Sequence, residues 1–220
     1  MKTIKLIMDG YKQWTESLGN DREWKIQAFQ HYFSYILYTK IAEIWGYVIP
    51  FRYDIYVILS DGIKEKQLLS AVQDIKTYSP TEIRICKGYN KTPLLSLYSC
   101  DEKIDLDTRP DEKVLVAHYD VDGITKMGLR EATERIELLK ENVRELGKKL
   151  GCIEHYFGGD NMGLFCSEDT AEEHILTSRE LEGVKVGIGI DIKARDALRK
   201  ATEALEIIRK YRGEKWKVIR

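Results

Sequence analysis

The sequence predicts an α+β protein built from two tandem copies of one small unit, and two observations indicate this fold class. The order strand, helix, strand-turn-strand, helix, strand occurs twice along the chain. Three pairs of landmarks also recur at slowly drifting offsets: Asp9 with Asp120, Asp54 with Asp160, and Gly88 with Gly189. This order is that of a split βαβ, ferredoxin-like unit. We therefore expect two antiparallel sheets, each covered by helices on one face only, whose other faces meet each other or frame a cleft.

Apolar and β-branched runs mark the expected strands. They occupy residues 3–8, 47–59, 82–86, 114–119, 152–166 and 184–190. Asp54 and Asp160 split the second and fifth runs, so we expect each of these two runs to form a hairpin.

Helical patterns fall between these runs, at residues 23–43, 64–77, 129–150 and 193–211. The third pattern is the clearest, because apolar residues such as Ile136, Leu139 and Val143 recur at spacings of three and four. The last helix carries an apolar stripe formed by Ala197, Ala201, Leu205 and Ile208.

A linker is expected at residues 101–112, which are acidic, contain Pro110 and lack periodicity. The predicted domains are therefore residues 1–100 and residues 113–220. The second domain carries the glycine-rich hairpin described below.

Composition and charge exclude some classes of partner. The 35 Lys and Arg residues against 36 Asp and Glu give a net charge of -1, so binding to bulk nucleic acid is not expected. No apolar run approaches the roughly 18 residues that span a bilayer, and the N-terminus is too polar and short for a signal peptide. We expect a cytoplasmic protein without nucleic-acid or membrane partners.

The four cysteines form no C-x-x-C pair, so a zinc site is not expected. Cys152 and Cys166 flank the second hairpin and can lie near each other. For a cytosolic protein we expect reduced thiols.

Two carboxylates stand at strand ends in the second half. Because side chains alternate along a strand, His118 and Asp120 share one face, while the residues between them pack on the helices. We expect His118 and Asp120 to point to the open face. Asp160, at the hairpin tip, can then come level with Asp120.

Two carboxylates this close repel each other unless a cation lies between them. Mg²⁺ takes oxygen ligands and leaves positions for phosphate and water. The predicted metal ligands are Asp120, Asp160 and the backbone carbonyl of Val121.

Glycines beside these carboxylates are expected to hold a nucleotide. The turn of Gly123, Ile124, Thr125 and Lys126 leads into a helix, so it offers backbone N–H groups to a triphosphate, and Lys126 adds a charge. Gly158 and Gly159 have no side chain, so a nucleotide can lie flat against their backbone.

Each feature also has an ordinary structural interpretation. An Asp-Asn pair beside glycines is common in hairpin turns. Residues 120–123 also fit a plain loop, and His118 also fits a half-buried histidine satisfied by a neighbour. Their matching places in one strand-helix-hairpin order favour the metal site.

This arrangement resembles the polymerase-palm and nucleotidyl-cyclase superfamily. Diguanylate cyclases carry Gly-Gly-Asp/Glu-Glu-Phe at the hairpin, whereas residues 158–161 here are Gly-Gly-Asp-Asn, followed by Met162. The second acid and the phenylalanine are missing, which argues against cyclase activity.

The chain is more similar to the archaeal GTP cyclohydrolase III family, over nearly its whole length. Five segments carry this resemblance: residues 9–11 with 14–15, 51–54, 117–120 with 124–125, 157–161, and 186–190 with 195–197. The Gly-Gly-Asp-Asn hairpin and the doubled architecture are its specific parts.

The resemblance implies an enzyme that releases two phosphates of GTP as orthophosphate and hydrolyses the imidazole ring open. The product is 2-amino-5-formylamino-6-ribosylaminopyrimidinone 5'-phosphate, early in the route to riboflavin and the deazaflavin coenzyme. It also implies a requirement for Mg²⁺, a monovalent cation as a helper, and a homo-oligomer, dimeric or tetrameric.

Candidate roles follow for the individual residues. Asp120 and Asp160 hold the metal, and either His118 or a metal-bound water opens the ring. Guanine presents N–H donors, so Asn161, or Asp54 reaching across from the first half, is expected to accept them.

The first half keeps Asp9 as a further candidate for substrate contact. It has Arg52 and Tyr53 where the second half has two glycines, so we expect it not to bind its own GTP. Arg52 is instead expected to face the triphosphate. Two alternatives stay open: a nucleotidyl cyclase that releases pyrophosphate, and a GTP-sensing module without chemistry.

Overall fold

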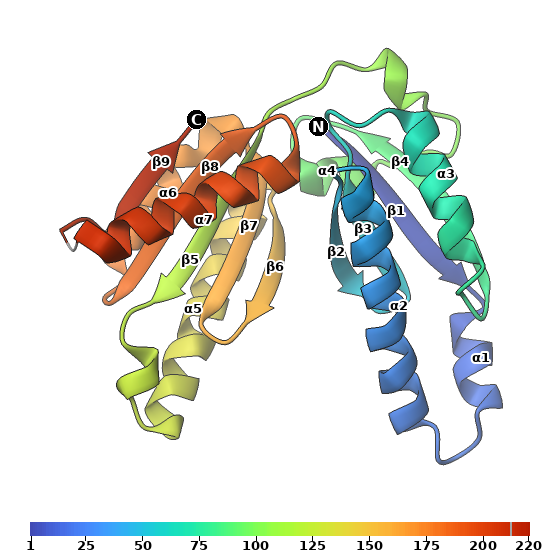
Figure 1. Ribbon diagram of the computed structural model, residues 1–220, viewed down its shortest axis with the longest axis horizontal. Helices are drawn as coiled ribbons and strands as arrows, with labels where there is room; N and C mark the ends of the chain where they lie inside the picture. Colours follow the sequence, from blue (N-terminus) through green and yellow to red (C-terminus); the bar gives the residue numbers. More distant parts are fainter. Residues whose placement is uncertain (212) are drawn as a thin grey trace.

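The computed structural model describes residues 1–211 and 213–220, and these form two halves, each built around one sheet (Figure 1). The first half contains β1 (Lys2–Asp9), α1 (Tyr11–Ser17), α2 (Glu23–Glu43), β2 (Tyr47–Arg52), β3 (Ile55–Leu59), α3 (Glu65–Lys76), β4 (Glu82–Tyr89) and α4 (Pro93–Tyr98). The second contains β5 (Val114–Val121), α5 (Leu129–Leu150), β6 (Ile153–Gly158), β7 (Asn161–Ser167), α6 (Ala171–Glu180), β8 (Val184–Asp191), α7 (Ala194–Tyr211) and β9 (Trp216–Ile219).

The strand order confirms the predicted doubled α+β fold. The first sheet runs β2-β3-β1-β4 and the second β6-β7-β5-β8-β9. All of the pairings are antiparallel except that of β8 with β9, which is parallel. No residue range was predicted for α1, α4, α6 or β9, although the repeated order of elements implies a helix at the place of α6. The fifth strand of the second sheet was therefore missed.

Two triplets of facing residues align the halves: Thr3, Leu59 and Gly88 in the first sheet, and Val116, Phe165 and Gly189 in the second. Gly88 and Gly189 occupy equivalent places because each lets a helix approach its strand. A Cβ on Gly88 would lie 2.0 Å from the carbonyl oxygen of Ser96, and one on Gly189 would lie 2.0 Å from that of Ala197.

This alignment corrects one part of the expected repeat. Counted from these triplets, Asp9 corresponds to Asp122 rather than to Asp120, and the counterpart of Asp120 in the first half is Ile7. The offset inferred from the Asp-Gly landmarks was therefore wrong by two residues. The first half consequently has an apolar side chain where the second half has its buried carboxylate.

The expectation that helices cover only one face is wrong for the second half. Leu115, Ala117 and Tyr119 pack toward α5 and α6, as predicted, but α7 crosses the opposite face (Figure 1). The cause is β9: a strand that runs parallel to its neighbour needs a crossover connection, and α7 is that connection. Gly187 and Gly189 on β8 leave room for the helix backbone.

The two halves meet at one end and splay apart toward the tips of the β2–β3 and β6–β7 hairpins (Figure 1). At the closed end, one buried cluster joins both halves and includes Val57, Leu97, Val116, Phe165 and Ala197. The sheet faces opposite α2, α3, α5 and α6 therefore meet at this end, where Leu97 of α4 and Ala197 of α7 join the cluster. Toward the hairpin tips a cavity lies between the halves.

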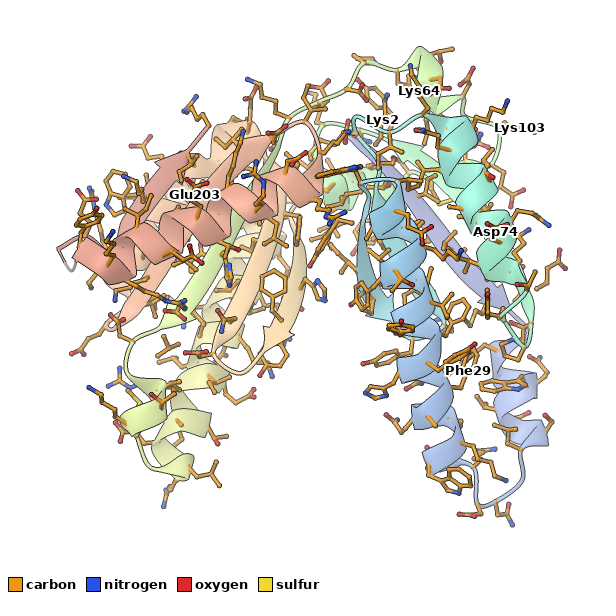
Figure 2. The ribbon with its side chains drawn as sticks, viewed as in Figure 1. Lys2, Phe29, Lys64, Asp74, Lys103 and Glu203 are labelled. Atoms are coloured by element: carbon orange, nitrogen blue, oxygen red, sulfur yellow. A yellow bond between two sulfur atoms is a disulfide. The ribbon has the colours of Figure 1, made fainter. Side chains whose placement is uncertain are left out.

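The connecting segment, residues 101–112, packs against the first half. Leu106 is buried in the first core, and the Lys2 ammonium lies 2.7 Å from Asp111. The buried carboxylate of Asp61 accepts hydrogen bonds from the N–H groups of Lys2 and Glu112, at 2.8 and 2.9 Å. Figure 2 places Lys2 at this closed end, near the connection between the halves.

Two disulfides join Cys86 to Cys100 and Cys152 to Cys166. The expectation of reduced thiols is therefore wrong. It rested on a general rule about compartments, which says nothing of which cysteines the fold brings together. Cys152 lies directly before β6 and Cys166 on β7, and these strands pair.

Removing the Cys86–Cys100 disulfide by Cys86→Ser with Cys100→Ser is expected to lower the free energy of unfolding by about 3 kcal/mol. The bond joins residues at a sequence separation of 14. Closing a loop of about that length lowers the conformational entropy of the unfolded chain enough to stabilise the fold by this amount. Denaturant unfolding with and without reductant measures the effect. Four free thiols in the native protein would contradict it.

Within the described residues, no helix is both long and apolar enough to cross a membrane.

Candidate metal and nucleotide site

The candidate site is built around Asp120, whose side chain is only 7% exposed. It projects from β5 toward α7, where Arg209 meets it. Arg209 donates from Nη2 to one carboxylate oxygen and from Nε to the other, the latter at 3.3 Å. His118 and Asp120 do share one face, as predicted, but that face is covered rather than open.

Arg209 is the cation that pairs with Asp120 at this site. Its hydrogen bonds with Asp120 raise the pKa of Arg209 above its ordinary value, and the charges of Asp120, Asp160 and Asp122 raise it further. The Arg209 side chain is 49% exposed, so it can leave Asp120 without having to leave a packed core.

Asp160 is held by a chain of hydrogen bonds that begins at His118. His118 Nε2 donates to Asn161 Oδ1 at 3.0 Å, and Asn161 Nδ2 donates to Asp160 Oδ1 at 2.8 Å. Burial lowers the pKa of His118, although Asn161 and the charges of Asp120 and Asp160 act in the opposite direction. The neutral imidazole therefore orients Asn161, and through it Asp160.

The hairpin that carries Asp160 owes its shape to its glycines. Gly158 and Gly159 have φ values of 101° and 60°, which lie in the region that favours glycine. The pairing of β6 with β7 shifts register between Tyr156 and Gly158. This irregularity places Asn161 opposite Gly158 and next to His118.

A basic pocket of about 560 Å³ borders Arg209. Its lining contains four cations, Lys126, Lys185, Arg209 and Lys215, against the carboxylates of Asp122 and Glu214. Lys185 pairs with Asp122. An excess of cations in one pocket suits a polyanion such as a triphosphate.

The predicted phosphate turn adjoins this pocket. Gly123 has a φ of 71° and precedes a short 3₁₀ turn, Ile124–Lys126, while α5 begins only at Leu129. The turn therefore contributes Lys126 to the pocket rather than the N-terminus of the long helix.

The residues predicted in the first half are paired within that half. The guanidinium of Arg52 donates to both carboxylate oxygens of Asp54, at 2.6 and 2.7 Å. The guanidinium of Arg84 likewise donates to both oxygens of Asp9, at 2.9 and 3.1 Å. Arg52 lines a different cavity, between the halves, so the structure does not bring it to the basic pocket. Asp9 lies at the end of β1 and pairs with a residue of β4, outside the group around Asp120.

Sequence reasoning missed Arg209 because the face that α7 covers depends on the crossover to β9. Two signals could have indicated it. Gly187 and Gly189 alternate on β8, and Ala197 and Ala201 repeat at a spacing of four on α7. Small residues on both elements predict a close helix–strand contact.

The oxygen donors fit a hard divalent cation. Asp120, Asp160 and the Val121 carbonyl are ligands of the kind Mg²⁺ prefers. Among the described side chains, a three-ligand cluster occurs only at Cys152, Cys166 and His174, and its two sulfurs form a disulfide. Phosphate oxygens and water would therefore have to complete the shell around Asp120 and Asp160.

Comparison with known proteins supplies the family. The family model for GTP cyclohydrolase III matches residues 1–219. A GTP cyclohydrolase III of Sulfurisphaera tokodaii is 42% identical over 221 residues, which cover 100% of this chain and 98% of that protein. A GTP cyclohydrolase III of Saccharolobus solfataricus is 31% identical over 226 residues, or 98% of each chain. Among solved structures, a bacterial light-regulated adenylyl cyclase aligns over 99% of this chain and 85% of its own, with a TM-score of 0.41 and 9% identity.

Proposed function

Because this chain belongs to the GTP cyclohydrolase III family, we propose that it hydrolyses GTP to 2-amino-5-formylamino-6-ribosylaminopyrimidinone 5'-phosphate in a Mg²⁺-dependent reaction. That it is an enzyme acting on GTP follows from the family. The product, the metal and the residue roles are the proposal. The observation that carries them is the buried Asp120, held by a cation of the chain itself beside a basic pocket.

The reaction consumes three waters. One adds at C8 of guanine, the C8–N9 bond breaks, and the formyl carbon stays on N7. The other two release the β- and γ-phosphates as two orthophosphates. We assign all of this chemistry to the second half, because only that half has a buried carboxylate at the position of Asp120.

Asp120, Asp160 and the Val121 carbonyl would hold Mg²⁺. When bound, the ion would neutralise phosphate charge and acidify a coordinated water. Asn161 and His118 act as positioning residues in this proposal, because their hydrogen bonds fix the carboxylate of Asp160.

Arg209 has two roles in this proposal. Without substrate it neutralises Asp120. With substrate its guanidinium turns to the triphosphate in the basic pocket, where Lys126 and Lys185 also lie. A planar guanidinium can donate two parallel hydrogen bonds to phosphate oxygens as it does to a carboxylate. Arg209 therefore keeps two hydrogen bonds when it moves from Asp120 to the triphosphate.

The family resemblance also motivates three further parts of the proposal. They are a monovalent cation as a helper, a homo-oligomer, and a place early in the route to riboflavin and the deazaflavin coenzyme.

Incubation with GTP and Mg²⁺ is expected to give two orthophosphates per GTP together with loss of the purine absorbance. Mass spectrometry should show a product that retains the formyl carbon, and EDTA should stop the reaction. Pyrophosphate with an unchanged ultraviolet spectrum would instead show a nucleotidyl cyclase. Stoichiometric binding without any product would show a sensor.

A further inference from the structure

Three side chains that can bind a metal meet in the core of the second half: Cys152, Cys166 and His174. The ligand atoms that they offer all lie within 4.8 Å of one another. Cys152 is 4% exposed, and the other two side chains are 0% exposed. The cluster shares no residue with the site around Asp120, so the proposed hydrolysis of GTP does not use it.

Three successive elements of the chain bring these residues together. The register of the β6–β7 hairpin pairs Ile153 with Phe165, so Cys152 and Cys166 stand opposite each other at the next position outward. The chain then leaves β7 and enters α6, which carries His174. Because α6 packs on the same sheet, the histidine returns to the end of the hairpin that the two cysteines close.

His174 has the protonation state and the orientation of a metal ligand. Burial lowers the pKa of His174 to about 4, so at neutral pH the imidazole is uncharged, which is the form that binds metal. The Tyr119 hydroxyl lies 2.8 Å from its Nδ1, as the second nitrogen of a metal-binding histidine is commonly held by a hydrogen-bond partner. Its Nε2 makes a longer contact, 3.3 Å, with the Thr170 hydroxyl.

Two thiolates and one imidazole are the donor set of Zn²⁺ rather than of Mg²⁺. Zn²⁺ binds sulfur at about 2.3 Å and imidazole nitrogen at about 2.0–2.1 Å, so ligand atoms around one ion lie about 4 Å apart. The cluster at 4.8 Å is therefore within a small side-chain adjustment of that geometry. Two thiolates also cancel the charge of a divalent ion, so the bound site would be neutral, as a buried position requires.

The other disulfide of the protein shows what is particular to this cluster. Within the part of the chain that the structure describes, Cys86 and Cys100 are joined in the same way but have no third ligand beside them. Only the pair Cys152 and Cys166 has a histidine within reach. Because its sulfurs are bonded to each other in the oxidised protein, they are available to a metal only after reduction.

We propose that Cys152, Cys166 and His174 form a redox-gated site for Zn²⁺, which the reduced protein binds and the oxidised protein releases. A dithiol reductant gives two electrons and two protons to the disulfide and becomes a disulfide itself. Zn²⁺ then replaces the two thiol protons, which leave to solvent. In the reverse direction a disulfide oxidant takes two electrons from the two thiolates, the S–S bond forms, and Zn²⁺ dissociates.

The site would keep one hairpin closed in both redox states. Cys152 and Cys166 lie at the base of the β6–β7 hairpin, whose tip carries Asp160. The disulfide joins the two strands in the oxidised protein, and the metal would join them in the reduced one. Metal binding should therefore raise the unfolding temperature of the reduced protein, because the folded state binds the ion more tightly than the unfolded chain does.

The test titrates Co²⁺, as a spectroscopic substitute for Zn²⁺, into protein reduced with a phosphine and freed of it under anaerobic conditions. Excess Mg²⁺ is present so that sites with oxygen ligands are filled. One Co²⁺ per chain is expected, with sulfur-to-cobalt charge-transfer absorption that Zn²⁺ abolishes. The oxidised protein should show no such absorption. Tyr119→Phe should weaken the affinity for Zn²⁺ about ten- to a hundredfold, because it removes the group that orients His174.

Matched cysteine variants assign the signal. Cys86→Ser with Cys100→Ser should keep the absorption, and Cys152→Ser with Cys166→Ser should lose it. The proposal is overturned if the first variant, with two free thiols and a native circular dichroism spectrum, gives no charge-transfer band, or if the second variant keeps the band. Should reduction unfold the first variant, recovery of the native spectrum on addition of Zn²⁺ supports the site, and failure to recover rejects it. None of these outcomes depends on whether the protein hydrolyses GTP.

Discussion

Replacing Asp120 by Asn is expected to reduce GTP hydrolysis on the order of a hundred- to a thousandfold while the protein stays folded. The substitution keeps the shape of a side chain that is only 7% exposed and removes its charge. Arg209 is half exposed, so it can return to water, and the stability change should stay near the small values measured for exposed ion pairs. Without the Asp120 charge the metal would be held less well and would stabilise less of the charge that develops in the transition state. Losses of this kind reduce rates by about this factor. Orthophosphate release and thermal unfolding, measured on the same preparation, check both parts.

Asp191→Asn is the matched control, since Asp191 is the last residue of β8 and its carboxylate pairs with Lys200 outside the basic pocket. We expect it to keep most of the activity. Asp9→Asn, at the position equivalent to Asp122 in the first half, should also keep it. If Asp9→Asn abolished turnover and Asp120→Asn did not, the catalytic half would be the first one.

Local patterns in the sequence predicted the elements of this fold well. The helix predicted at residues 129–150 has those bounds in the structure, and so does the one at 23–43. Both have apolar periodicity or length that no short strand can imitate. The strands predicted as hairpins are paired as expected, because a residue common in turns, Asp54 or Asp160, interrupts each apolar run.

What could not be predicted depends on contacts between distant segments. Trp216–Ile219 pairs in parallel with β8 because the folded sheet leaves that edge of β8 available. This pairing decides which face of the sheet α7 covers. The disulfides likewise depend on which strands become neighbours. The two-residue error in the repeat has a simpler cause: an Asp-Gly pair marks the turn, whereas the candidate metal ligand Asp120 lies two residues earlier, on the strand.

Replacing Arg209 by Ala is expected to change two affinities in opposite directions. Without nucleotide, divalent-cation binding should strengthen about five- to tenfold, because Asp120 no longer has an internal partner. GTP binding should weaken about ten- to a hundredfold, because a forked donor to the triphosphate is lost. Electron paramagnetic resonance of free Mn²⁺ measures the first affinity, and titration with GTP measures the second.

Arg199→Ala controls for loss of an arginine from the same helix, since Arg199 is exposed and pairs with Asp196 at 3.7 Å. It should change neither affinity. A purely structural role for Arg209 predicts that both affinities fall together as the β5–α7 contact loosens, and Arg209→Lys would then restore both. If Arg209 instead moves between Asp120 and the triphosphate, the Mn²⁺ affinity rises while the GTP affinity falls. Arg209→Lys should then restore GTP binding only in part, because an ammonium lacks the paired donors of a guanidinium. A tighter affinity of Arg209→Ala for Mn²⁺ therefore indicates that the metal displaces Arg209 from Asp120, and a weaker affinity indicates a purely structural role.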